Sequence, residues 1–171
     1  MLAALAVSAG PAAVGSDKGG SSEKAFVAAT AKDMLGAVQT CEASKSGDRF
    51  DGTKVRRGGW RRLSPPGVMS EGQSMFGNRS SGASITISSM EDRSGNACVI
   101  IGWVDDDDAA TSSERLIAEE MGLSLKALSA RHAEASNEGW KYSFLRFTRP
   151  DVTDQVRLLV AIEPEHSGKD S

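Results

Sequence analysis

The segment Ala97-Cys-Val-Ile-Ile-Gly-Trp-Val104 determines the fold of this chain. It is apolar at both odd and even positions, which is typical of a central strand of a sheet. Just before it, Ser84–Met90 places Ile85 and Ile87 on one face and polar residues on the other, as in a half-buried strand. The intervening residues 91–96 have turn chemistry, so the two segments are predicted to be strands joined by a turn.

Further strands are expected on both sides of this pair. Residues 60–63 and 74–77 are short candidates within an irregular region, 43–82, which is rich in Gly, Ser, Pro and Arg. A region of this kind is either functional or poorly ordered. Towards the C-terminus a hairpin is predicted, with one strand carrying Trp140, Tyr142 and Phe144 and the other carrying Val156, Leu158, Val160 and Ile162.

Two helices complete the pattern. The first is expected over residues 23–42, capped by Ser21 or Ser22, with an apolar stripe formed by Val27, Ala31, Met34, Val38 and Cys41. The second is expected to begin with Thr111 and Glu114, which have capping-box spacing, and to end at Gly122, with Leu123 packing back. The predicted fold is therefore α+β: a mostly antiparallel sheet of about five strands with both helices on one face.

The 171 residues indicate one domain, expected over residues 23–163. Residues 1–15 resemble a signal peptide, since 2–14 are uncharged and Ala13 and Gly15 suit a cleavage site. The basic residues that begin such signals are missing, and an alanine-rich first helix of the mature fold is the alternative. Residues 16–22 are expected to form a flexible linker and 164–171 a disordered tail. A periplasmic or secreted protein follows from this interpretation.

The two cysteines, Cys41 and Cys98, fit an oxidising compartment, and we expect them to form a disulfide. Cys41 would end the buried face of the first helix and Cys98 lies near the start of the central strand, so the bond would join these elements. Two unrelated buried thiols are the alternative. Neither cysteine has a second Cys or a His at zinc-ligand spacing, so no metal site is predicted.

The short segments that resemble catalytic motifs do not match these motifs fully. Gly72-Gln-Ser-Met-Phe76 lacks the last glycine of a nucleophile elbow, and Ser21-x-x-Lys24 lies in the expected linker. The acidic run Asp105–Asp108 does not continue as a calcium-binding loop, and His132 and His166 are expected to be solvated. The prediction is a binding or structural module with no cofactor and no catalytic residues. A hydrolase with a dispersed Asp, Glu and Ser site is the alternative.

Charge is distributed unevenly along the chain. Residues 42–82 carry eight basic and four acidic side chains, whereas 91–120 carry nine acidic and two basic ones. The densest basic part is a candidate anion-binding segment consisting of Arg56, Arg57, Trp60, Arg61 and Arg62, in which the indole could stack on a planar group. The alternative places Trp60 in the core, with the arginines solvated or paired with Asp105–Asp108.

An anionic envelope component or an acidic protein surface is the expected partner of this segment. The net charge of −3 argues against nucleic acid, whose binding domains are strongly basic. No apolar stretch is long enough for a transmembrane span.

Several loose motifs together resemble small uncharacterised exported proteins of alphaproteobacteria. They are the leader, the helix ending in Cys41, Gly47-Asp48, Gly59-Trp60, the proline-containing loop and the strand cysteine Cys98. The resemblance implies a periplasmic bacterial protein and carries no established activity with it.

Overall fold

The computed structural model describes residues 27–63, 72–89, 96–148 and 155–165. Within these ranges the helices are α1 (Ala31–Ser44), α2 (Gly52–Arg57) and α3 (Asp107–Glu120). The strands are β1 (Lys45–Ser46), β2 (Arg49–Phe50), β3 (Arg61–Leu63), β4 (Gln73–Gly77), β5 (Ala83–Ser89), β6 (Asn96–Val104), β7 (Lys126–Ser129), β8 (His132–Asn137), β9 (Trp140–Thr148) and β10 (Val156–Pro164). The fold is α+β, as the sequence predicts.

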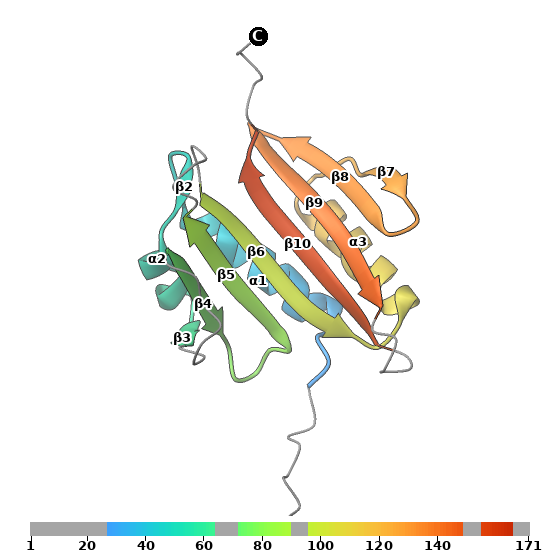
Figure 1. The fold of residues 1–171 in the computed structure, drawn as a ribbon, viewed down its shortest axis with the longest axis horizontal. Coiled ribbons are helices and arrows are strands. Elements are labelled where there is room, and N and C mark those ends of the chain that lie inside the picture. Colours follow the sequence, from blue (N-terminus) through green and yellow to red (C-terminus); the bar gives the residue numbers. More distant parts are fainter. Residues whose placement is uncertain (1–26, 64–71, 90–95, 149–154, 166–171) are drawn as a thin grey trace, which may run out of the picture.

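Eight of these strands form one sheet, in the order β3-β4-β5-β6-β10-β9-β8-β7 (Figure 1), and every pair in it is antiparallel. β6 lies in the middle, between β5 and β10, which confirms the central position predicted from its apolar sequence. β1 and β2 form a separate two-stranded sheet.

The core lies between the sheet and the helices α1 and α3, which lie on the same face of the sheet (Figure 1) and contact each other. Alternate residues of the central strands point into it, among them Ile100 of β6, Leu158 of β10 and Phe144 of β9, all fully buried. Met34 and Val38 of α1 and Ile117 of α3 cover them.

Helix α1 begins later than predicted. Thr30 is its N-cap: the Thr30 hydroxyl accepts from the Asp33 amide and the Asp33 carboxylate accepts from the Thr30 amide. This capping box starts the helix at Ala31. Val27 is therefore not part of the buried stripe and is 70% exposed. Ala29 instead donates its amide hydrogen to the carbonyl of Trp103 at 2.6 Å, which ties this segment to β6.

Helix α3, in contrast, begins earlier than its predicted start at Thr111. The Asp106 side chain accepts from the Ala109 amide at 2.7 Å and caps the helix, so part of the acidic run belongs to the helix terminus. Its C-terminal end is as predicted: Gly122 has φ +64°, and the Leu123 amide donates to the Ala118 carbonyl at 2.8 Å. This is a Schellman arrangement.

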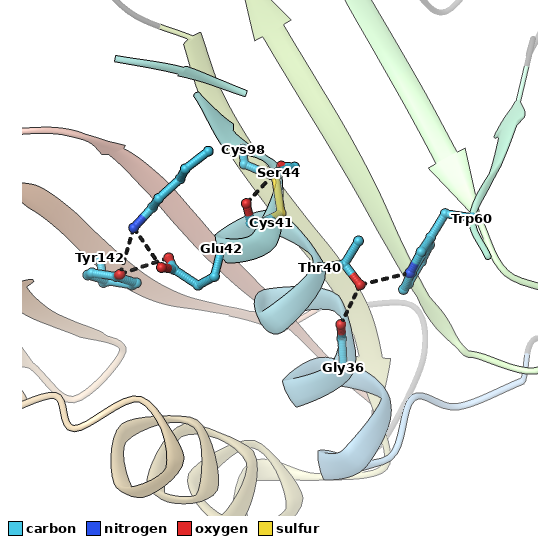
Figure 2. Close-up of a disulfide and its surroundings, with 9 residues drawn as sticks. Gly36, Thr40, Cys41, Glu42, Ser44, Trp60, Cys98 and Tyr142 are labelled. Carbon is cyan, nitrogen blue, oxygen red and sulfur yellow. Dashed lines mark hydrogen bonds and ion pairs between the residues drawn. A yellow bond between two sulfur atoms is a disulfide. The ribbon is translucent and has the colours of Figure 1, made fainter. Parts of the chain in front are cut away.

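The predicted disulfide is present. Cys41 on α1 and Cys98 on β6 are bonded across 57 residues of sequence, and both are fully buried (Figure 2). The bond joins the first helix to the central strand of the sheet, as expected.

The predictions of five strands and two helices were wrong. The sheet has eight strands because β7 and β8 extend it beyond β9. Their sequences are mainly polar, and Leu128 is their one large apolar residue. The irregular region 43–82 contributes the third helix, α2, and the strands β1 to β4. β10 extends one residue into the predicted tail, to Pro164. The leader, residues 1–15, and the linker, residues 16–22, lie outside the described residues.

Candidate functional site

The candidate anion-binding segment spans α2 and β3, at one edge of the large sheet (Figure 1). Asp51 caps α2 by accepting from the Thr53 amide at 2.7 Å, and this bond lowers the pKa of the Asp51 carboxyl. The helix has only six residues, and Gly59, with φ +89°, turns the chain into β3. The side chains of Arg56, Arg57, Arg61 and Arg62 are exposed along this turn.

Trp60 does not belong to that exposed surface. It is 5% exposed, and its Nε1 donates to the Thr40 hydroxyl of α1 at 3.1 Å (Figure 2). The Thr40 hydroxyl in turn donates to the Gly36 carbonyl at 2.8 Å. The indole therefore anchors the start of β3 on α1 and is not available for stacking on a ligand. This is the alternative that places Trp60 in the core.

The four arginines are also not neutralised by the acidic run. Among the described residues there is no ion pair within 4.0 Å between Arg56, Arg57, Arg61 or Arg62 and Asp105–Asp108. Asp107 instead lies 3.9 Å from Arg146 of β9, next to Glu114. We call the four arginines the α2–β3 arginine surface.

Lys54, the neighbouring basic residue of α2, differs from these arginines. Its Nζ donates to the Lys45 carbonyl at 2.9 Å, so it holds α2 against the β1–β2 hairpin. Nothing in the sequence separates this anchoring cation from the exposed arginines beside it.

A second polar cluster, missed from the sequence, joins α1 to β9 beside the disulfide. The Tyr142 hydroxyl donates to Glu42 at 2.8 Å (Figure 2), and Lys45 Nζ lies 2.7 Å from the other Glu42 oxygen and 3.1 Å from the tyrosine oxygen. Lys45 Nζ also lies 4.4 Å from the centre of the Trp140 ring. Burial and the Glu42 bond raise the pKa of Tyr142. The cluster satisfies its own hydrogen bonds and fixes the end of α1 on the sheet.

The described residues include two sizeable hollows. One, of about 530 Å³, lies between α3 and the loop that follows it, and Glu114 and Leu123 line it. The other, of about 340 Å³, lies beside Trp103 and Phe147 on the opposite face of the sheet. No group of three metal-binding side chains occurs within the described ranges, and no helix there is long and apolar enough to cross a membrane.

Comparison with protein-family models, with curated proteins and with solved structures found no match to this chain.

Proposed function

We propose that this protein is an exported binding module of the cell envelope, periplasmic or secreted, that attaches to an extended anionic surface. The observation that carries the proposal is the α2–β3 arginine surface: four guanidinium groups that are exposed and have no ion pair with any described residue. A short helix and an edge strand hold them at one edge of the molecule, where a large surface can approach.

The physical basis is additive attraction. Each basic side chain close to an anionic membrane surface contributes about 1 kcal/mol, so four together give weak, reversible attachment. The attraction is screened over about 8 Å at physiological ionic strength, and binding should therefore weaken as salt rises. Neither of the two hollows described above is lined by these arginines. Their exposure on a short helix and an edge strand fits an extended anionic surface.

The disulfide supports the export part of the proposal. Bonds of this kind persist in oxidising compartments and are rare where glutathione keeps thiols reduced. A Cys41–Cys98 bond that is fully buried and joins helix to sheet belongs to the folded framework.

A hydrolase with a dispersed acidic site is the alternative function. It requires a carboxylic acid whose pKa is raised towards neutrality. Asp51 and Glu134, the described carboxyls with a shifted pKa, shift downwards because they accept hydrogen bonds. Glu114, which lines the larger hollow, is held by Arg146. These observations favour a binding module.

The test replaces Arg56, Arg57, Arg61 and Arg62 together by glutamine. Cosedimentation with vesicles of phosphatidylglycerol and phosphatidylcholine should be lost, while the melting temperature stays unchanged because the side chains are exposed. The control replaces the exposed Lys32, Arg115, Lys126 and Arg131 by glutamine; it has the same net charge and should still sediment. Equal sedimentation of both variants would overturn the proposal, as would equal binding to vesicles of phosphatidylcholine alone.

A further inference from the structure

The large sheet has a second face that no helix of the described ranges covers (Figure 1). On the three central strands this face is half-buried and mostly apolar. Its apolar residues include Val99, Ile101 and Trp103 of β6, Leu159 and Ala161 of β10, and Leu145 of β9, and the buried Ser143 of β9 lies opposite Ala161. An antiparallel sheet with one solvated face normally carries polar residues there. The apolar composition of this face calls for an explanation.

At one end of this face Lys141 of β9 is the direct partner of Glu163 of β10, whereas the row at the other end contains Arg157. In the strand register Arg157 of β10 is the direct partner of Trp103 on β6 and of Phe147 on β9. Directly opposed side chains in an antiparallel sheet lie within contact distance of each other. The guanidinium of Arg157 is therefore placed in an aromatic row, with one ring on each side.

The Nε atom of Arg157 is buried and has no hydrogen-bond partner among the described residues. A buried polar group without a partner is costly, and such groups in folded proteins call for a specific explanation. The two terminal nitrogens are not buried in this way. They also make no ion pair with a described residue. The guanidinium thus has free donors at the surface of an otherwise apolar row.

A hollow lies next to these donors. It has a volume of about 340 Å³ and is lined by Trp103, Phe147, Thr148 and Arg157. Phe147 is 47% exposed, so its ring has a free side at the rim. This volume is at the lower end of the range for small-molecule sites, which is about 300–1,000 Å³.

We propose that this hollow is a binding site for a small organic carboxylate with a flat apolar body. The carboxylate would accept hydrogen bonds from the Arg157 guanidinium, whose paired donors match its two oxygens. The apolar body would lie over Trp103 and the exposed side of Phe147, where contact with the rings removes apolar surface from water.

This site is independent of the proposed function. It lies on β6, β9 and β10, whereas the α2–β3 arginine surface lies at the edge of the sheet, beyond β4. Neither site shares a residue with the other, so variants of one leave the other intact.

The test uses 4-phenylbutyrate and its uncharged analogue 4-phenylbutyramide, with binding followed by saturation-transfer NMR and isothermal titration calorimetry. The carboxylate should bind more tightly than the amide. Arg157→Gln should weaken carboxylate binding by about tenfold or more, the effect of losing a charged hydrogen-bond pair. Phe147→Ala should weaken the binding of both the carboxylate and the amide. The matched controls are Leu63→Ala, an exposed apolar residue of β3, and the glutamine variant of the four arginines; both should bind as the unmodified protein does.

Circular dichroism checks that each variant is folded. Arg157→Lys is a second variant, which keeps the positive charge but loses the paired donors of the guanidinium. It should also bind the carboxylate more weakly. Equal affinity for the acid and the amide would overturn the proposal, and so would carboxylate binding that both Arg157 variants leave unchanged. A third outcome would also overturn the proposal. If the protein binds no carboxylate but sedimentation shows a dimer that Phe147→Ala disperses, a second copy of the chain covers this face.

Discussion

Arg146 on β9 donates its Nε to a carboxylate oxygen of Glu114 on α3 at 2.7 Å, and a second guanidinium nitrogen contacts the other oxygen. The two side chains are 14% and 11% exposed. The Glu114 bond raises the pKa of Arg146 above its ordinary high value. This pair fixes α3 on the sheet, and Asp107 of the same helix lies 3.9 Å from Arg146.

Replacing Glu114 by glutamine should therefore destabilise the protein. The change leaves the Arg146 charge largely buried without its partner, and breaking such a pair costs about 2–3 kcal/mol. Urea denaturation measures the free energy of unfolding. Glu119→Gln, an exposed position on the same helix, is the control and should stay within about 0.5 kcal/mol of the unmodified protein. Equal stability of the two variants would contradict the structural role of the pair.

The disulfide gives a second prediction. A bond that closes 57 residues should stabilise the fold by about 4 kcal/mol in the chain-entropy model. The double variant Cys41→Ala with Cys98→Ala should lose about that much free energy of unfolding, measured in urea. Thiol counting on the unmodified protein, denatured without reductant, should find no free thiol. Two alkylated cysteines in that experiment would refute the bond.

Tyr142 is the one tyrosine of the chain, so absorbance near the tyrosinate band reports on it alone. Its raised pKa follows from burial first and from the hydrogen bond to Glu42 second. In an alkaline titration the folded protein should form tyrosinate only at a pH above the ordinary tyrosine pKa of about 10, whereas the urea-unfolded protein should titrate near that value.

The same shift links stability to pH. Because the folded pKa lies above the unfolded one, the contribution of Tyr142 to stability is fully present below the unfolded pKa and is lost as the pH rises from there towards the folded pKa. Tyr142→Phe should remove this alkaline dependence, measured as the urea midpoint against pH. An ordinary tyrosinate titration in the folded protein would show that the hydroxyl is not held by Glu42.

Strong apolar patterns made part of the fold predictable. The α+β class, the central position of β6 and the hairpin of β9 and β10 follow from alternation or continuous apolar runs, and Gly122 marks the end of α3 through its backbone conformation. The strands β7 and β8 were missed because their mainly polar sequences form strands through pairing, β8 with β9 and β7 with β8. Tertiary pairing of this kind leaves little trace in local sequence.

The candidate site was predictable to a similar degree. The basic character of residues 56–62 is visible in the sequence, but burial of Trp60 depends on Thr40, which lies 20 residues away. The row of Trp103, Arg157 and Phe147 joins three strands and could not be assembled without the sheet order. Register sets such contacts, and one sequence does not specify register between distant strands.

Two glycines that look alike in the sequence should respond in opposite ways to alanine. Gly102 on β6 faces α1, where an added Cβ would lie 2.8 Å from the Cβ of Ala29 and would clash with the sulfur of Met34. Gly102→Ala should destabilise the fold by about 1–3 kcal/mol through overpacking. Gly36 lies inside α1 with no atom within 4 Å of an added Cβ, so Gly36→Ala should stabilise the protein by about 0.5–1 kcal/mol. Urea denaturation of both variants measures the free energy of unfolding, which should fall for Gly102→Ala and rise for Gly36→Ala. A stabilising Gly102→Ala would contradict the close packing of α1 on the central strand, and a strongly destabilising Gly36→Ala would contradict the open space beside that turn of the helix.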